Sequence, residues 1–431
     1  MRIAIEGRIA DLTADQKTLL FERRPSDEAA VQQATRALLD DVRARGDDAL
    51  REMTAKFDRV QLDAIEIPKA RWTQAVASLD PDVRSALERA ARNIEAFHRA
   101  QIPAEVRLGV EPGVLLGRRF VPLGAVGVYA PGGRAAYPSS VLMGVVPARA
   151  AGVREIVVCS PPGESGEPSD VVMAAAAIGG ATRLFAVGGA GAIGAMAFGT
   201  ESVPPCAAIV GPGNRWVLEA KRQVAGEVII DSPAGPSEVL VVADEGCADP
   251  AWLAAELICQ AEHDPDAAVA FATTSPALLA QVRDALQQAV PETPRREVVE
   301  TALSTMGALL LAADHDELID FTERYAAEHL QLCTRDAHTD LARLTTAGTV
   351  FIGAPSSVAF GDYMTGANHV LPTAGTARSF SGLSTLNFLR SYTWQELTPE
   401  GAASLAEPVG TLADAEGLPA HAAAARLRGR G

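Results

Sequence analysis

The chain has 431 residues, of which 48% are hydrophobic and 21% are charged, a balance that indicates a well-packed globular protein with more than one domain. Its formal net charge of −16 argues against a nucleic acid partner, because an acidic surface repels phosphate groups. The five cysteines are scattered and form no C-x-x-C pair, which favours a reducing compartment, the cytoplasm, over a disulfide framework or a cysteine zinc cluster.

The N-terminal part of the chain predicts an arm followed by helices. The first 25 residues lack the apolar core of a signal peptide, and uncharged stretches elsewhere are too short for a transmembrane helix, so no membrane association is expected. Ser26 is placed to cap a helix whose apolar residues recur at helical spacing from Val31 to Val42, until Gly46. A second helix begins at Asp80-Pro81, where aspartate caps and proline occupies the first turn.

From about residue 121, short apolar runs alternate with helical segments, which is the pattern of parallel sheets wound by helices. One set of strands is expected at 124–130, 155–160, 184–187, 207–210 and 228–231, with helices containing 171–178, 192–198 and 215–224. A second set of strands is expected at 239–243, 268–273, 308–311, 330–333 and 350–352, with helices around 251–261 and 277–288. Two doubly wound α/β domains explain both sets most economically.

The pattern ends after Pro372, and only a short alanine-rich helix is expected beyond it, at Ala422–Leu427. Such a tail packs on its own domain or reaches a partner. We therefore expect four parts: an arm at 1–25, a first α/β domain from 26–120 together with 237–375, a second Rossmann-like domain at 121–236, and a tail at 376–431.

Two glycine-rich turns join strands to helices and favour nucleotide binding. Gly189-Ala-Gly191-Ala-Ile-Gly194 has the G-x-G-x-x-G spacing, at a place where backbone amides could hold a pyrophosphate. No ribose-binding acid ends the next strand, however, so glycines that permit close helix packing explain this motif equally well. The second turn, Gly211-Pro-Gly213-Asn214, repeats the arrangement and adds a side chain able to bind a ligand.

Several polar residues are candidates for metal binding and proton transfer. Gln260 and His263 are three apart on a predicted helix and share one face, as metal ligation requires, although a helical histidine is more often an ordinary surface residue. Glu328-His329 lies where a helix gives way to a strand and suits proton transfer, or is an exposed charged pair. Asp362 and His369 lie in a polar loop, and sequence distance alone does not bring any of these residues together.

Together these segments resemble the histidinol dehydrogenase family over almost the whole chain. Several long strings in the same order carry the resemblance, which makes it far more specific than any single motif. They are YAPGGRAAYPSSVLM at 129–143, GTESVP at 199–204, GPGN at 211–214, AGPSEVLVVAD at 234–244, QAEHD at 260–264, EHL at 328–330, GDY at 361–363, NHVLPT at 368–373 and EGLPAH at 416–421.

The resemblance assigns roles to individual residues. The zinc ligands that it implies are Gln260, His263, Asp362 and His421, the last donated by the partner subunit. The implied catalytic acid–base pair is Glu328 and His329. The implied substrate contacts are Ser237, His369 and Glu416, together with Glu328 and the four zinc ligands. The implied dinucleotide contacts are Tyr129, Asn214 and the position of Gly191.

This sequence departs from the family pattern at two positions. Gly191 stands where the family usually has a glutamine that it uses toward NAD, so the middle glycine of the G-x-G-x-x-G string is not a Rossmann fingerprint and the pose of NAD there is open. Ala327 replaces the proline usual before Glu328-His329, a milder change that should leave the pair in place.

The resemblance implies an α/β fold of two incomplete doubly wound, Rossmann-like domains, with a helical N-terminal region and a C-terminal tail exchanged across a homodimer. It further implies one zinc per subunit and NAD-dependent oxidation of L-histidinol through L-histidinal to L-histidine, the last steps of histidine biosynthesis, in the cytoplasm. Three alternatives remain open. They are a paralogue acting on another alcohol such as sulfopropanediol, a zinc hydrolase that uses water activated by Glu328, and a non-catalytic nucleotide-binding module.

Overall fold

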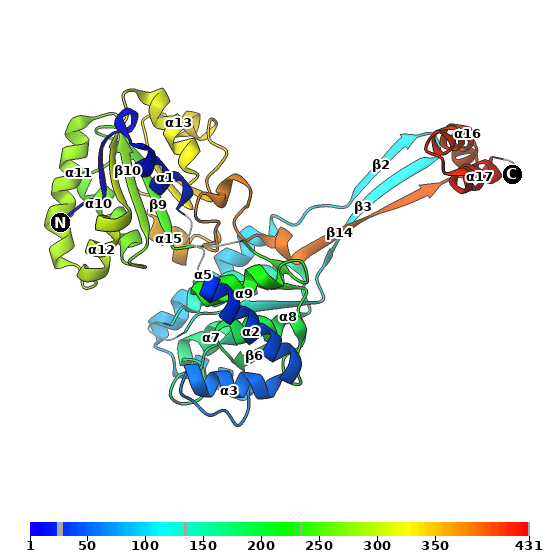
Figure 1. The fold of residues 1–431 in the computed structure, drawn as a ribbon, viewed down its shortest axis with the longest axis horizontal. Helices are drawn as coiled ribbons and strands as arrows, with labels where there is room; N and C mark the ends of the chain where they lie inside the picture. Colours follow the sequence, from blue (N-terminus) through cyan, green and yellow to red (C-terminus); the bar gives the residue numbers. More distant parts are fainter. Residues whose placement is uncertain (24–28, 133–135, 233–234, 430–431) are drawn as a thin grey trace.

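The computed structural model describes residues 1–23, 29–132, 136–232 and 235–429 of the chain. Two α/β lobes lie next to each other, and a long arm leaves them and carries the C-terminal helices at its tip (Figure 1). Ser26, the expected helix cap, lies outside the described residues. Within the described part of the chain, every helix is too short or too polar to cross a membrane.

The first lobe is built on a six-stranded parallel sheet in the order β1-β11-β10-β9-β12-β13. Its edge strand β1 comes from the expected N-terminal arm and pairs Ile5 with Ala308. The strands are β1 (Ile5–Arg8), β9 (Glu238–Ala243), β10 (Ala268–Thr273), β11 (Gly307–Leu311), β12 (His329–Cys333) and β13 (Thr349–Ile352). β9, β10 and β12 are buried along their whole length, as expected for central parallel strands covered on both faces.

Helices cover both faces of this sheet. α10, α11 and α12 enclose one core with Val239 and Phe271, and α1 and α13 enclose the other with Leu240 and Leu330. The helices are α1 (Ala14–Glu22), α10 (Pro250–Ala261), α11 (Pro276–Ala289), α12 (Arg296–Met306), α13 (His315–Tyr325), α14 (Ala337–Leu341) and α15 (Val358–Tyr363). Short 3-10 helices occur at η1 (Ile9–Asp11), η2 (Val290–Glu292), η3 (Thr376–Arg378) and η4 (Thr385–Phe388).

The second lobe contains a five-stranded parallel sheet in the order β6-β5-β4-β7-β8. The strands are β4 (Ala125–Tyr129), β5 (Glu155–Ser160), β6 (Arg183–Ala186), β7 (Ala208–Val210) and β8 (Ile229–Ile230). The connecting helices are α6 (Pro138–Ala151), α7 (Asp170–Gly179), α8 (Gly189–Phe198) and α9 (Arg215–Val224). α6 and α7 share one core with Val126, and α8 and α9 share the other with Ile209, so both sequence-predicted α/β sets are present.

The N-terminal helices α2 (Ala29–Arg45), α3 (Asp47–Phe57), α4 (Lys69–Ser78) and α5 (Pro81–Arg99) pack on this second lobe. Leu39 and Leu50 join the core beneath β7, while Trp72 and Ile94 join the core on the other face. We expected residues 26–120 to belong with 237–375, and the packing differs from that grouping. The reason is that the apolar stripes of α2–α5 meet α6–α9, a partnership that helical periodicity does not specify.

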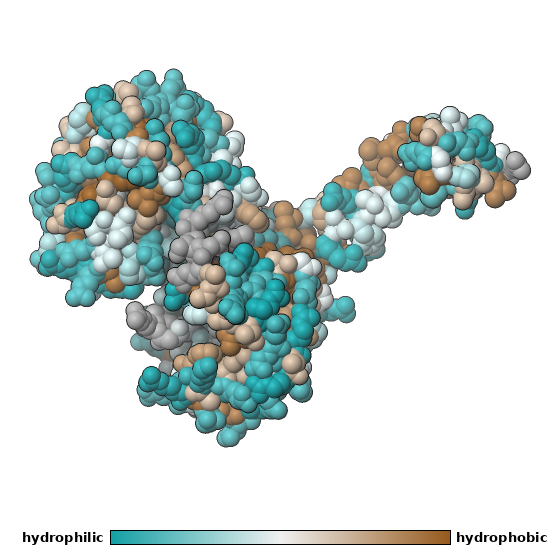
Figure 2. Space-filling view, viewed as in Figure 1, coloured by the Kyte–Doolittle hydropathy of each residue, from teal (hydrophilic) through white to brown (hydrophobic). Residues whose placement is uncertain are grey.

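The arm is a three-stranded antiparallel sheet in the order β14-β3-β2, followed by two helices. The elements are β2 (Val106–Glu111), β3 (Val114–Pro122), β14 (Leu389–Leu397), α16 (Pro399–Ala415) and α17 (Pro419–Arg428). The sequence predicted only the last of these helices. All six residues of β2 are exposed, and Figure 2 shows hydrophobic residues gathered along the arm and at its tip. The exposed apolar residues of the arm include Leu108, which is 57% exposed, and Leu412, which is 68% exposed.

Candidate active site

The predicted catalytic pair and the predicted substrate contact Ser237 lie at the amino-terminal edge of the six-stranded sheet. Ser237 directly precedes β9, Glu328 directly precedes β12, and His329 is the first residue of β12. These two strands are parallel neighbours, with His329 opposite Val239. Parallel pairing therefore brings Ser237, Glu328 and His329 to one edge, although about 90 residues separate Ser237 from the other two in the sequence.

One residue, Glu238, holds both members of the predicted acid–base pair through its peptide groups. Its backbone N–H donates to Oε2 of Glu328 at 2.7 Å, and its carbonyl oxygen lies 2.9 Å from Nδ1 of His329. A carbonyl only accepts, so Nδ1 of His329 is the donor. Nε2 then faces Asp362, 3.5 Å from its Oδ1, and makes no hydrogen bond within the described residues.

Burial and charge set the protonation of this pair. Both side chains are almost completely buried, and burial raises the pKa of the Glu328 carboxyl. Burial alone would lower the pKa of His329, but the Glu328 carboxylate 3.4 Å from Nδ1 and the Asp362 carboxylate raise it well above its usual value. The site thus concentrates negative charge around one imidazole.

Asp362 lies on the short helix α15, whose first turn is hydrogen-bonded to α10. Val358 N, at the start of α15, donates to Oε2 of Glu256 on α10 at 3.1 Å, which supplies the acceptor that the local cap lacks. Gly361 lies against the Phe351 ring, which a β-carbon would approach within 2.6 Å. Burial acts to raise the pKa of Asp362, but the contact with His329 and the charges of His369 and His263 together outweigh burial and lower the pKa.

Gln260 lies in the last turn of α10, but His263 lies two residues beyond the end of the helix at Ala261, in the turn before β10, so the prediction that both residues belong to one helix was wrong. Gln260 is buried, yet its Oε1 accepts no hydrogen bond from any described residue. His263 N donates to the carbonyl of Gln260 at 3.2 Å, and burial lowers the pKa of His263 against the opposing charge of Asp362. The C-terminal end of a helix is electrically negative and favours a cation, which agrees with the metal role predicted for this pair.

His369 lies where the two lobes meet. Its Nδ1 is 3.0 Å from the carbonyl of Asp362, and its Nε2 is 3.5 Å from Oγ of Ser140 on α6. The neighbouring Asn368 donates to the carbonyl of Met143, also on α6, at 2.8 Å. The loop that carries Asp362 and His369 therefore ties the six-stranded lobe to the five-stranded lobe beside the site.

The predicted dinucleotide contacts lie at the carboxyl edge of the five-stranded sheet. β4 has β5 on one side and β7 on the other, so the chain reverses direction across the sheet between β4 and β7. Ligands of such sheets bind at this switch point. Tyr129 ends β4, and its hydroxyl accepts from Gly189 N at 3.2 Å. Gly211 follows β7 with φ of 117°, and a β-carbon there would lie 2.1 Å from the carbonyl oxygen of Tyr129.

Asn214 and Gly191 have structural roles at this edge. Asn214 caps α9, where its Oδ1 accepts from Trp216 N at 3.0 Å and from Val217 N at 3.2 Å. A β-carbon at Gly191 would lie 3.1 Å from Sδ of Met53 on α3. Gly191, like Gly194 beside Leu39 of α2, thus permits close helix packing, which was one of the two interpretations of the G-x-G-x-x-G string, whereas a β-carbon at Gly189 would meet no atom within 4 Å.

Glu416 and His421 are not brought to the other site residues. Glu416 ends α16, His421 belongs to α17, and both are exposed at the tip of the arm. Figure 1 places this tip far from β9 and β12. Within one chain, the structure therefore gathers Ser237, Gln260, His263, the Glu328-His329 pair, Asp362 and His369, and leaves the two tail residues apart.

Among the described residues, no three His, Cys, Asp or Glu side chains are arranged to hold a metal ion. The predicted ligand set agrees with this, because only two of the three ligands predicted from one chain, His263 and Asp362, are of these types, and the third is the amide of Gln260. The unsatisfied buried oxygen of Gln260 and the carboxylate of Asp362 fit a zinc ion that takes a further ligand from elsewhere.

Sequence reasoning missed three residues that hold the site. Glu238 opens an otherwise apolar strand, and this isolated charge was the available signal. Lys221 and Asp231 form a buried pair that binds Gly211, since Nζ of Lys221 donates to the Gly211 carbonyl at 3.0 Å and Oδ2 of Asp231 accepts from Gly211 N at 2.8 Å. No pattern in the sequence identified Lys221 and Asp231.

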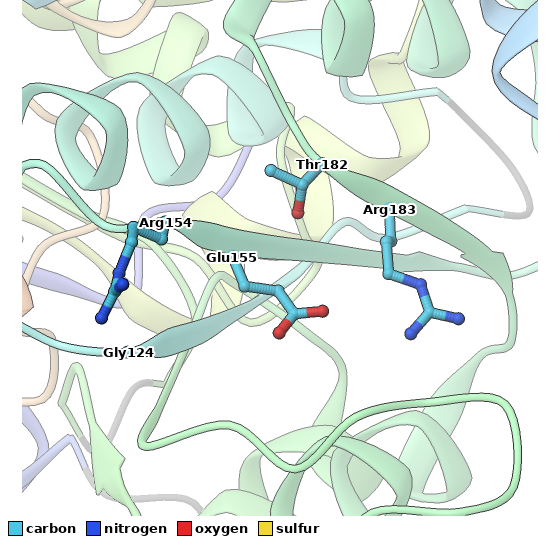
Figure 3. A pocket seen from close by; sticks show the side chains of 5 residues that line it. All are labelled: Gly124, Arg154, Glu155, Thr182 and Arg183. Atoms are coloured by element: carbon cyan, nitrogen blue, oxygen red, sulfur yellow. The ribbon is translucent and has the colours of Figure 1, made fainter.

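Two hollows lie outside the dyad. Figure 3 shows one of about 530 Å³ at the amino edge of the five-stranded sheet, where the Glu155 side chain lies between Arg154 and Arg183. None of the predicted site residues lines it. The other, an apolar groove of about 190 Å³, runs between α5 and α6 and includes Tyr363 and Met364, which directly follow Asp362.

Comparison with known proteins gives a consistent result. The family described as histidinol dehydrogenase matches residues 21–429. The histidinol dehydrogenase of Halobacterium salinarum is 48% identical over 97% of this chain and 98% of its own, and that of Xanthomonas campestris is 44% identical over 97% of each. The crystal structure of histidinol dehydrogenase from Elizabethkingia anophelis superposes with a TM-score of 0.94 at 34% identity and covers 99% of this chain and 98% of its own.

Proposed function

The chain belongs to the histidinol dehydrogenase family, and from this premise we propose how its residues carry out the NAD-dependent oxidation of L-histidinol through L-histidinal to L-histidine. The observation that carries the proposal is the arrangement of the dyad. Nδ1 of His329 and the carboxylate of Glu328 are held by one residue, and Nε2 of His329 faces Asp362 at 3.5 Å and makes no hydrogen bond within the described residues.

In this proposal Gln260, His263 and Asp362 of one subunit hold a zinc ion together with His421 of the partner subunit. A zinc ion bound there would anchor the substrate through the nitrogen atoms of the substrate, and so would keep the alcohol in one orientation through both oxidations. Positive charge beside Asp362 would also oppose the effect of that carboxylate on His329, because it favours the neutral imidazole.

The chain's own groups move the protons. Nε2 of His329 accepts the proton of the substrate hydroxyl while the carbon-bound hydride passes to NAD, which gives the aldehyde. Glu328, whose pKa burial raises, removes a proton from water that adds to the aldehyde carbon. Protonated His329 returns its proton to the former aldehyde oxygen, which gives the hydrate. The hydrate then loses a hydroxyl proton to Nε2 of His329 and a second hydride to a second NAD, and yields the carboxylic acid. Ser237 and His369 are placed to contact the substrate beside the dyad, and Glu416 of the partner subunit completes these contacts.

We place NAD at the switch point of the five-stranded sheet. Tyr129 and the turn at Gly211–Asn214 lie at the carboxyl ends of β4 and β7, where backbone amides are available. Gly191 offers only its backbone, and Asn214 uses its Oδ1 as a helix cap, so its amide nitrogen is the group left for the cofactor. The dinucleotide edge and the dyad edge belong to different lobes, which His369 and Asn368 connect.

The active unit is a homodimer in this account. The exposed apolar residues of the arm, Leu108 and Leu412 among them, need a partner surface, and the groove beside Tyr363 is one such surface next to Asp362. Tail exchange brings His421 and Glu416 to a site that their own chain cannot reach. We further propose the cytoplasm as the compartment, because all five cysteines are free thiols.

The direct test is NADH formation from L-histidinol, measured with and without a chelator. We expect about two NADH per L-histidine formed, loss of activity on chelation and recovery on adding zinc. Sulfopropanediol serves as the control substrate and should be oxidised far more slowly. Full activity in protein shown to be free of metal, or a clear preference for the control alcohol, would contradict the proposal.

A further inference from the structure

Glu238 connects the dyad to a part of the chain that the proposed function does not use. While its peptide groups hold Glu328 and His329, its carboxylate is buried and 2% exposed. Oε1 accepts from Arg23 Nε at 3.0 Å and from Ala374 N at 2.5 Å, and Oε2 accepts from Arg23 Nη2 at 3.1 Å. The peptide groups of Glu238 therefore bind the two dyad side chains, and its carboxylate binds the guanidinium of Arg23.

Arg23 is held as firmly as its partner. It follows α1 with a left-handed φ of 31°, and its guanidinium lies 3.9 Å from the centre of the Tyr325 ring. Nη2 also donates to the carbonyl of Tyr325 at 2.7 Å, and Nη1 donates to the carbonyl of Leu20. Because the planar guanidinium of Arg23 is hydrogen-bonded along its edges and stacked on an aromatic ring, it has a single orientation. A lysine ammonium could not make the same set of contacts.

Such a pair is a poor source of stability. Removing two charges from water is costly, and apolar side chains of the same size often serve a core equally well. Two parallel hydrogen bonds between a guanidinium and a carboxylate do, however, fix the direction of the carboxylate. In this chain the fixed carboxylate belongs to the residue that orients both dyad side chains.

We propose that Arg23 is a positioning residue for the reaction, acting through Glu238 on Glu328 and His329. The inference rests on the proposed roles of the dyad. It makes the N-terminal segment, which also supplies β1, part of the active-site architecture. Arg23 touches neither member of the dyad and neither proton transfer uses it, so its effect is on geometry alone.

The test compares Arg23→Ala and Arg23→Lys with Arg378→Ala in purified, zinc-loaded enzyme. Arg378 is the matched control, because it binds the carbonyls of Phe21 and Arg324 at 3.2 Å in the same region but does not touch Glu238. We expect both Arg23 variants to lose kcat by roughly 10- to 100-fold for L-histidinol and for L-histidinal, with KM nearly unchanged, because displaced catalytic groups slow chemistry more than binding.

Exogenous guanidinium at concentrations below those that unfold the protein should restore part of the kcat of Arg23→Ala and none of that of Arg378→Ala. A purely structural role would instead change the melting temperature or zinc content and leave kcat per folded, zinc-loaded site intact. That result, or equal losses in Arg378→Ala, would overturn the proposal. Should Arg23→Ala fail to fold, the kcat of Arg23→Lys decides. An inactive wild type would count against the proposed function and not against the role of Arg23.

Discussion

The two lobes share one architecture, and the predicted site residues lie at opposite edges of their sheets. In the five-stranded lobe, Tyr129 and Gly211 lie at the carboxyl ends of β4 and β7, the usual place for a ligand of a parallel sheet. In the six-stranded lobe, Ser237 and Glu328-His329 lie at the amino ends of β9 and β12. The first edge offers glycine turns and backbone amides, and the second offers charged side chains.

Each lobe also holds its edge with a buried ion pair. Asp231 accepts from the N–H of Gly211 and Lys221 donates to its carbonyl, while Arg23 and Glu238 fix the peptide groups that bind the dyad. The two sheets are built alike, so the residues at their edges determine the chemistry of each lobe. Changes at the amino edge should therefore affect the reaction steps, and changes at the carboxyl edge should affect NAD binding.

The largest effects are expected at the dyad. His329→Asn should slow both oxidations, because each needs a proton acceptor, by roughly 10²–10⁴-fold. Glu328→Gln should slow the conversion of L-histidinal to L-histidine by a similar factor and affect the first oxidation less, since only the later step uses activated water. Single-turnover measurements with each substrate separate the two steps. Normal aldehyde oxidation by Glu328→Gln would move the water-activating role elsewhere.

A smaller effect, confined to the other edge, is expected at Lys221. Lys221→Met leaves Asp231 buried without its partner, so the free energy of unfolding should fall by roughly 3–5 kcal/mol. The released Gly211 turn should raise the KM for NAD more than the KM for L-histidinol. Thermal unfolding and steady-state kinetics at saturating zinc measure both quantities. Equal changes in the two KM values would contradict the assignment of NAD binding to the carboxyl edge of the five-stranded sheet.

The smallest effect is expected at Asn214. Asn214→Ala removes the cap of α9 and should lower the free energy of unfolding by about 1 kcal/mol. If its amide nitrogen also contacts NAD, the KM for NAD rises beyond what the capping loss explains. Asn214→Asp is the control, because it keeps the capping oxygen and removes only the amide donor. Equal KM values for NAD in Asn214→Asp and in wild type would remove Asn214 from the cofactor contacts.

The sequence predicted local elements well and long-range placement poorly. The strands at 155–160 and 268–273 and the helix at 215–224 match the structure residue for residue. Each segment has the apolar spacing of its element and is bounded by turn residues. β1 and β14 were missed. Their partners β11 and β3 lie far away in the sequence, and β14 has a mostly exposed surface that no hydrophobic pattern marks.

The same limit applies to the site. Residue types and family strings named Gln260, His263 and Asp362, but only the fold brings α10 beside α15. Glu238 was missed because its two roles depend on a strand neighbour and on Arg23, which is 215 positions away. The placement of α2–α5 on the five-stranded lobe likewise depends on complementary surfaces that one sequence does not reveal.

The central claim is that one site combines the amino edge of one subunit with the arm tip of the other. His263→Asn and His421→Asn homodimers should each be nearly inactive, because every site loses a zinc ligand. Unfolding and refolding the two variants together should pair about half the chains into mixed dimers, each with one intact site, so activity should recover to about a quarter of wild type. Mixed dimers confirmed by differential tagging that show no recovery would contradict the shared site and place His421 in the site of its own chain.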